Sequence, residues 1–339
     1  MTFATERREV IYFDPDLAQI ASALERAIPQ LPQIRFVDSS QDESRLLIWA
    51  GSDTDPGRFL LFDRRTKRLD DLMDVRPMLA GVPLASVKPV TYKAADGTPI
   101  PAYLTLPPGR EDAKGLPAIV MPHGGPSSRD EWGFDWLSQY FANRGFAVLQ
   151  PNFRGSAGYG ESWFLKKGFQ SWRTAIGDVD DGARWLVSQG IADPKKLAIV
   201  GWSYGGYAAL QSAVAEPGLF GAVVAIAPVT DLEMLKNERQ NWSNYRRAMR
   251  LIGTGDTMTT GSPAHNAAKI KVPVLIFHGT FDRNVGIRES RLMDSRLKDA
   301  GGKSELVIYE KLDHQLEDGK ARADMLAKSD AFLRASLGL

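Results

Sequence analysis

Alternation between apolar runs and helical patterns, which continues from about residue 116 to the end of the chain, limits the fold more than any other feature. Six runs have the length and apolar character of buried strands: 116–122, 145–153, 196–202, 221–229, 272–279 and 304–310. Between them, four segments repeat apolar residues with a helical period: 134–144, 176–190, 207–217 and 287–301. Nearly continuous apolar strands are typical of a sheet that is covered on both faces. The sequence therefore predicts a doubly wound, mostly parallel α/β sheet over residues 86–339.

Residues 1–85 have a different pattern. Leu17, Ile20, Leu24 and Ile28 lie on one face of a predicted helix, and the segment 35–72 reads as three short strands separated by turns rich in Asp, Ser, Gly and Pro. This is the character of an antiparallel meander. We therefore predict two domains, a small β-rich one at 1–85 and an α/β one at 86–339.

Composition excludes several classes of function. A net charge of +1 gives no electrostatic basis for binding nucleic acid or an anionic membrane. The absence of cysteine excludes thiolate catalysis and cysteine-ligated metals. The N-terminal residues lack an apolar core of signal-peptide length, and no apolar run is long enough to span a bilayer. We expect a cytoplasmic protein without a nucleic-acid or membrane partner.

The strand at 196–202 leads into the helix at 207–217 through residues 201–205, which fit the pattern G-x-S-x-G around Ser203. Such a turn forces its central residue into strained dihedral angles, and the flanking glycines let strand and helix approach closely. The serine hydroxyl is then raised above the sheet edge, beside the positive end of the following helix. Ser203 is a candidate nucleophile, with an ordinary glycine-rich turn as the alternative.

A serine nucleophile needs a base and an acid that orients the base. Of the four histidines, only His314 follows both the serine and a loop acid that comes after a strand, which is the α/β-hydrolase order. That acid is Asp282, just beyond the strand that ends at 279. A turn-forming role for Asp282 and a surface position for His314, which adjoins Asp313, are the alternatives. The order of all three residues, each at a strand end, favours a catalytic triad.

The oxyanion of acyl transfer needs hydrogen-bond donors. The amide of Tyr204, next to the nucleophile, is one candidate. The early turn at 121–128 offers Gly124 and Gly125, and Pro126 cannot donate, which favours the amide of Gly125. A glycine turn without function is the alternative.

Six segments together resemble the prolyl oligopeptidase family of serine peptidases, in particular its acylaminoacyl-peptidase and dipeptidyl-peptidase-like branch. They are HGGP at 123–126, PNFRGSAGYGESW at 151–163, the block at 177–210 that contains GWSYGGY, APVTD at 227–231, KVPVLIFHGTFDRNV at 271–285 and DHQLED at 313–318. The resemblance implies an α/β-hydrolase fold with Ser203 as nucleophile, Asp282 as acid and His314 as base. It also implies oxyanion donors at Gly125 and Tyr204.

Further roles follow from the same resemblance. Asn284 aligns with an asparagine that contacts a substrate carbonyl. Tyr245 falls near an aromatic wall of the S1 pocket, and a packed helix aromatic is the alternative. Gln315 departs from the family, whose last motif usually has glycine after the histidine. Residues 1–85 resemble only the final blade of the family's β-propeller, since each blade takes roughly 40–45 residues. We expect a more open site.

The predicted activity is a serine hydrolase that cleaves peptide or acyl-aminoacyl bonds. A carboxylesterase with the same triad is the second hypothesis, and an inactive binding module is the third. No metal or organic cofactor is expected, because the chain has no H-E-x-x-H and GSAGYG at 155–160 has no convincing βαβ dinucleotide context. The expected partner is a peptide or ester substrate. Exposed edges of the small β domain would favour a homo-oligomer.

Overall fold

The computed structural model describes residues 2–4, 6–164, 169–243 and 245–339. The chain divides into two compact units. The first comprises Met1–Pro89, Thr105–Glu111 and Glu131–Asn143, and the second comprises Val90–Leu104, Asp112–Asp130 and Arg144–Leu339. The division into domains at 1–85 and 86–339 stays a prediction, because compact units of contact do not show which segments fold independently.

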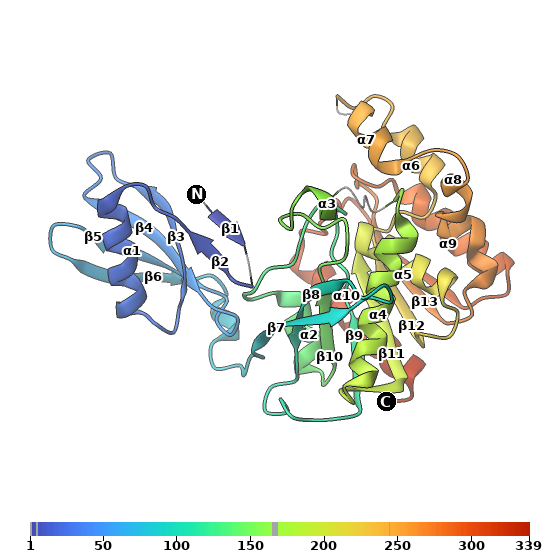
Figure 1. Cartoon of the computed structure of the whole chain (residues 1–339), viewed down its shortest axis with the longest axis horizontal. Coiled ribbons are helices and arrows are strands. Elements are labelled where there is room, and N and C mark those ends of the chain that lie inside the picture. The colour runs from blue at the N-terminus through green and yellow to red at the C-terminus, as the bar shows by residue number, and fades with distance from the viewer. Residues whose placement is uncertain (1, 5, 165–168, 244) are drawn as a thin grey trace. The chain divides into compact units, whose positions relative to one another are not determined.

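The first unit contains a hairpin, an antiparallel sheet and several helices (Figure 1). Its elements are β1 (Thr2–Ala4), β2 (Arg8–Val10), α1 (Pro15–Ala27), β3 (Gln33–Ser39), β4 (Arg45–Gly51), β5 (Arg58–Asp63), β6 (Arg68–Asp74), the 3₁₀ helix η1 (Pro77–Leu79) and α2 (Trp136–Asn143). Strands β3 to β6 pair antiparallel in sequence order. Four strands joined in this way have the form of a single propeller blade.

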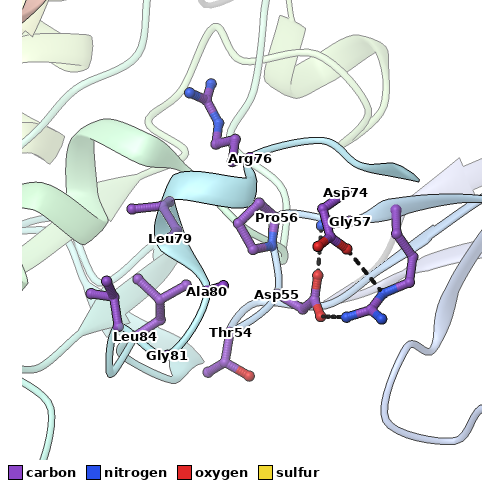
Figure 2. Close-up of a pocket in the computed structure, with 12 residues that line it drawn as sticks. Thr54, Asp55, Pro56, Gly57, Asp74, Arg76, Leu79, Ala80, Gly81 and Leu84 are labelled. Carbon is purple, nitrogen blue, oxygen red and sulfur yellow. Dashed lines mark hydrogen bonds and ion pairs between the residues drawn. The ribbon is translucent and has the colours of Figure 1, made fainter. Parts of the chain in front are cut away.

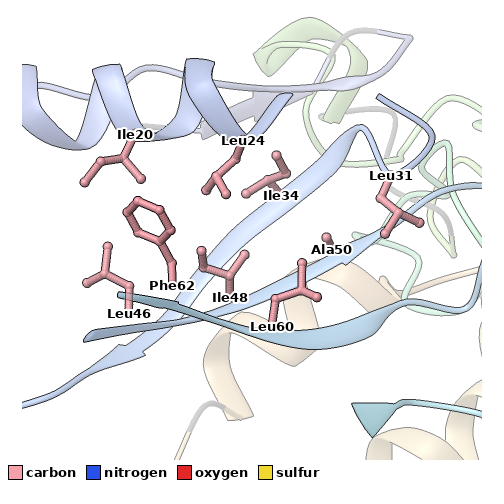
Figure 3. Packing of buried hydrophobic residues seen from close by; sticks show 9 residues of the cluster. All are labelled: Ile20, Leu24, Leu31, Ile34, Leu46, Ile48, Ala50, Leu60 and Phe62. Atoms are coloured by element: carbon pink, nitrogen blue, oxygen red, sulfur yellow. The ribbon is translucent and has the colours of Figure 1, made fainter. Parts of the chain in front are cut away.

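Helix α1 packs its apolar face on this sheet. The helix begins where the Asp14 carboxylate accepts hydrogen bonds from the amides of Asp16 and Leu17, at 2.8 and 3.1 Å, which satisfies two otherwise unpaired donors. Figure 3 shows the buried cluster between helix and sheet, made of Ile20, Leu24, Leu31, Ile34, Leu46, Ile48, Ala50, Leu60 and Phe62. Leu17 and Ile28 pack against the same cluster, so the predicted apolar face of the helix is confirmed.

The prediction of three short strands over 35–72 is wrong, because β3 to β6 place four strands there. Strand β6 has the sequence RLDDLMD, whose adjacent acidic residues are typical of a turn rather than a strand. It lies at the edge of the sheet and is mostly exposed. Charged side chains are tolerated at such an edge, where they also discourage unwanted strand pairing.

The second unit is built on an eight-stranded sheet with the strand order β14-β13-β12-β11-β9-β10-β8-β7. Its strands are β7 (Val87–Lys93), β8 (Pro99–Thr105), β9 (Leu116–Val120), β10 (Ala147–Pro151), β11 (Ala192–Trp202), β12 (Ala222–Ile226), β13 (Val274–Gly279) and β14 (Ser304–Tyr309). The six strands β9 to β14 are consecutive in this order, and each pair of neighbours among them is parallel. They correspond to the six apolar runs of the sequence.

Helices complete the second unit (Figure 1). They are α3 (Glu161–Phe164), α4 (Trp172–Ser188), α5 (Tyr204–Ala215), α6 (Leu232–Glu238), α7 (Tyr245–Ile252), α8 (Thr257–Thr260), the 3₁₀ helix η2 (Pro263–Lys269), α9 (Ile287–Asp299) and α10 (Gly319–Leu337). Strands β10, β12 and β13 are buried along their whole length, as expected for a sheet covered on both faces. The predicted doubly wound α/β fold is confirmed.

A pocket of about 290 Å³ lies in the first unit, between the turn before β5 and the segment around η1 (Figure 2). An ion pair between Arg58 and Asp55 at 3.1 Å stands on one side of it. None of the residues that the sequence singles out as functional lines this pocket. Among the described residues, no helix combines the length and apolar character needed to cross a membrane.

Candidate active site

Ser203 lies at the sharp turn between β11 and α5. Strand β11 ends at Trp202, helix α5 begins at Tyr204, and Ser203 between them has φ 60° and ψ −119°. A non-glycine residue with this φ is strained, and such strain is typical of a nucleophile turn. The Ser203 amide donates to the carbonyl of Ile226 in β12 at 2.8 Å, which holds the turn on the sheet. The predicted strand-turn-helix geometry is therefore present, and Ser203 remains partly exposed.

The glycines on either side of Ser203 are required by close packing. A Cβ at Gly201 would lie 2.1 Å from the carbonyl oxygen of Gly205, inside the turn itself. A Cβ at Gly205 would lie 2.1 Å from the carbonyl oxygen of Pro122, in the loop that follows β9. That loop therefore lies directly against the start of α5, and any side chain at these two positions would push the elements apart.

Asp282 and His314 meet beyond the ends of β13 and β14. These neighbouring strands are parallel, so the loops that follow them emerge at the same edge of the sheet. The Nδ1 atom of His314 is 2.5 Å from Oδ2 of Asp282, and both side chains are largely buried. Since an ionised carboxylate only accepts, His314 Nδ1 carries the proton, which leaves Nε2 free to act as a base.

The Asp282 carboxylate is held by several donors. Its Oδ1 accepts from the amides of Asn284 and Val285 at 2.8 and 2.9 Å, and its Oδ2 lies 3.1 Å from Nε2 of His278. Burial alone would raise the pKa of Asp282, but the hydrogen bonds from His278, His314 and the Val285 amide outweigh burial and lower that pKa below its usual value. The acid therefore stays ionised over the whole physiological range.

A hydrogen bond connects the turn of Ser203 to the loop of His314. The indole Nε1 of Trp202 donates to the carbonyl of His314 at 2.9 Å, which joins the residue before Ser203 to the loop that carries His314. Within the described residues, however, the Ser203 hydroxyl makes no hydrogen bond. Nucleophile–base hydrogen bonds are often long without substrate and tighten when it binds. The structure thus brings Asp282 and His314 together and joins the turn of Ser203 to the loop of His314.

The loop after β9 brings the second predicted oxyanion donor to the nucleophile. A Cβ at Gly124 would lie 3.5 Å from Cβ of Ser203, so the backbone of this loop contacts the turn. Gly125 is exposed with φ 123°, and the bond between Gly125 and Pro126 is cis. Within the described chain, the amides of Gly125 and Tyr204 donate to no protein acceptor. An oxyanion requires unpaired N–H donors of this kind.

His123 fixes the shape of this loop. Its Nδ1 donates to the carbonyl of Gly124 at 2.7 Å, its Nε2 lies 2.7 Å from the Ser156 hydroxyl, and its ring stacks on Phe153. Burial lowers the pKa of His123 to about 4, so the ring is neutral at physiological pH. A buried, neutral and fully engaged histidine orders the backbone that carries Gly125.

The two predicted substrate contacts have different surroundings. Asn284 shares the loop of Asp282, and its side chain is exposed. Tyr245 begins α7 and is partly buried. No hydrogen bond or ring contact joins Tyr245 to the other predicted site residues in the part of the chain that the structure describes.

Three residues that hold the acid loop were missed by sequence reasoning. Arg239, beyond the end of α6, donates to the carbonyl of Asn284 at 2.6 Å, and Glu238 accepts from the amide of Gly286 at 3.0 Å. Both act across more than 40 positions of sequence, and no local pattern marks them. His278 lies near the end of β13, and no spacing in the sequence marks it either. Over the described ranges, no group of three or more His, Asp or Glu residues is arranged to hold a metal ion.

Comparisons with known proteins identify the family to which the chain belongs. A family model, the Prolyl oligopeptidase family, matches residues 132–339. Dipeptidyl aminopeptidase BIII of Pseudoxanthomonas mexicana is 35% identical over 245 residues, which cover 68% of this chain and 35% of that protein. Dipeptidyl peptidase family member 6 of Caenorhabditis elegans is 28% identical over 335 residues, which cover 90% of this chain and 45% of that protein.

A solved structure of a peptidase is also similar to this chain. A puromycin-hydrolyzing peptidase of Mycobacterium tuberculosis superposes with a TM-score of 0.78 and 26% identity, over 87% of this chain and 46% of that one. The chain thus spans less than half the length of these relatives. The family model covers more than half of the chain, including every predicted site residue except Gly125. The chain belongs to the prolyl oligopeptidase family.

Proposed function

We propose that the chain is a serine hydrolase that cleaves peptide or acyl-aminoacyl bonds with Ser203, Asp282 and His314. The observation that carries this proposal is the buried contact of 2.5 Å between Asp282 and His314, at the same sheet edge as a serine in a strained strand-to-helix turn. The names of the relatives, which include dipeptidyl and acylamino-acid peptidases, support the choice of bond.

The first half-reaction acylates the serine. His314 takes the Ser203 proton at Nε2, since its Nδ1 already donates to Asp282. The serine oxygen attacks the substrate carbonyl carbon, and the charge that develops on the carbonyl oxygen is bound by the amides of Gly125 and Tyr204. One such donor contributes about 3–4 kcal/mol of transition-state stabilisation. Asp282 stabilises the imidazolium without taking its proton.

The second half-reaction releases the acyl group. When the tetrahedral intermediate collapses, His314 gives its proton to the leaving amine or alcohol. Water then enters, loses a proton to His314 and attacks the acyl-enzyme carbonyl. The same two amides bind the second oxyanion, and Ser203 leaves with the proton from His314.

Asn284 is the proposed contact for a substrate carbonyl. Its amide donates to Asp282 and its carbonyl accepts from Arg239, so its backbone is fully used. Its exposed side-chain amide makes no hydrogen bond among the described residues and can donate to a substrate. Tyr245 stays a proposal for a wall of the S1 pocket, on the resemblance alone.

The test is hydrolysis of matched substrate pairs by the wild type and by Ser203→Ala. Each pair joins one acyl or aminoacyl group either to p-nitrophenol or to p-nitroaniline, so that only the bond differs. Cleavage of the anilides that is lost in Ser203→Ala supports the peptidase. Turnover of the esters alone supports the carboxylesterase instead. Equal rates of hydrolysis by the wild type and by Ser203→Ala would exclude Ser203 as the nucleophile.

A further inference from the structure

His278 is a buried histidine that the proposed mechanism does not use. It lies next to the end of β13 and is fully buried, so substrate cannot reach it. Its ring contacts three other parts of the chain. Nδ1 lies 2.7 Å from the Ser290 hydroxyl in α9, and Nε2 lies 2.9 Å from the carbonyl of Val285 and 3.1 Å from Oδ2 of Asp282.

These contacts determine where the proton of the ring lies. A carbonyl oxygen and a carboxylate oxygen only accept, so a bare Nε2 would face two acceptors and repel both. Nε2 therefore carries the proton and shares it between Val285 and Asp282. In the neutral ring Nδ1 is then the acceptor, and the Ser290 hydroxyl donates to it.

The second of these acceptors is the carboxylate that orients His314. Its two oxygens are held differently: Oδ1 by two backbone amides of its own loop, and Oδ2 by His314 and His278. His278 differs from the loop amides because it lies on β13, a strand that is paired on both sides, with β12 and with β14. It therefore fixes the position of Oδ2 relative to the rigid part of the fold rather than relative to the loop.

We propose that His278 is a positioning residue of the active site: with its proton on Nε2, it holds the Asp282 carboxylate and the Val285 carbonyl close to strand β13, and so keeps His314 oriented toward Ser203. This inference rests on the proposed function for its catalytic consequence. The proton assignment and the effect on His314 do not depend on it.

Two substitutions separate the hydrogen bond from the packing. His278→Leu keeps an apolar side chain of similar bulk but removes the donor, whereas His278→Gln keeps an N–H at a similar reach. For His278→Leu we expect kcat to fall roughly ten- to a hundredfold, as for other partners that orient a catalytic ligand. KM should be unchanged, because substrate does not touch the ring. His278→Gln should recover most of kcat.

A matched control tests whether a general loosening of helix α9, which contains Ser290, would lower kcat in the same way. Glu289, the neighbour of Ser290, is also fully buried but bonds to Thr230 and Asp231 instead of the acid. Glu289→Gln should keep the wild-type kcat. If His278→Leu and Glu289→Gln lower kcat alike, or if His278→Leu keeps the wild-type kcat, the inference is overturned.

Nuclear magnetic resonance of ¹⁵N-histidine-labelled chain provides a readout that needs no substrate. With only four histidines, single variants assign every ring. We expect His278 with a protonated Nε2 and a bare Nδ1, and a strongly hydrogen-bonded Nδ1 proton on His314 that weakens in His278→Leu. A protonated Nδ1 on His278, or a His314 signal unaffected by His278→Leu, would refute the inference. If the wild type cleaves no substrate but shows these signals, only the proposed function fails.

Discussion

Substitution of Gly205 by alanine should disable the site without touching a catalytic side chain. The added Cβ would lie 2.1 Å from the carbonyl oxygen of Pro122, although real Cβ atoms essentially never approach within 3.0 Å. The obstacle is backbone, so no side-chain rotation relieves it. Either the start of α5, with Ser203 and the Tyr204 amide, or the loop that carries Gly125 has to move.

The size of the effect follows from the size of that movement. Restoring an ordinary C···O contact needs a displacement of about 1 Å, and a misplacement of this size costs on the order of 10²-fold in rate. If the Gly125 amide leaves the oxyanion altogether, the loss reaches about 10³-fold. Alanine is the better helix former by about 1 kcal/mol, so loss of helix propensity cannot explain the defect.

The matched control is Gly206→Ala, one position further along the same helix. Its added Cβ would meet Pro228 Cβ at 3.0 Å and two carbonyl oxygens at 3.2 Å, which asks for shifts of only a few tenths of an ångström. We expect kcat/KM of Gly206→Ala to stay within about threefold of the wild type, a difference of less than 1 kcal/mol. Wild-type kcat/KM in Gly205→Ala, or equal losses in the two variants, would refute the packing argument.

Three further predictions test other parts of the account. Asp282→Asn removes the acceptor of the His314 Nδ1 proton, so kcat on the best anilide should fall roughly 10⁴-fold, and a loss below tenfold would contradict the assigned role. Burial raises the pKa of Glu289 from 4.5 to about 8, so this carboxyl favours the folded chain below pH 4.5 and loses that contribution as the pH rises toward 8. In urea titrations at several pH values, the stability of Glu289→Gln should therefore depend less on pH between these limits than that of the wild type. An unchanged slope would refute this role of Glu289. Ile48 is fully buried between α1 and the sheet of the first unit, so Ile48→Ala should lower the free energy of unfolding by about 2–5 kcal/mol in urea; an unchanged midpoint would show that this core contributes nothing.

Six of the eight strands of the α/β sheet could be predicted, because the information for them is local. Each of the six apolar runs becomes a strand, and the parallel order follows from the helices between them. Strand β6 could not be predicted, since the adjacent acidic residues Asp70 and Asp71 contradict local strand propensity and are tolerated only by an edge position. The edge of a sheet is a property of the assembled fold.

The residues of the site also divide into those that the sequence predicts and those that it does not. The glycine spacing around Ser203 predicts it as the nucleophile, and the order of the four histidines along the chain predicts His314 as the base. Arg239 and His278 could not be found in this way. The role of Arg239 depends on the carbonyl of Asn284, far along the chain, and that of His278 depends on the Asp282 carboxylate, which lies against strand β13. Spacing thus predicts the groups proposed to react, whereas the groups that hold them in place are set by packing.

Covalent labelling shows directly whether Ser203 is an activated nucleophile. The wild type, Ser203→Ala and His314→Ala would be treated with a fluorophosphonate, and the modified peptide identified by mass spectrometry. We predict rapid, stoichiometric labelling of the wild type on Ser203, none in Ser203→Ala, and a rate in His314→Ala that is lower by several orders of magnitude. An unlabelled but folded wild type, or a label on another residue, would contradict the account.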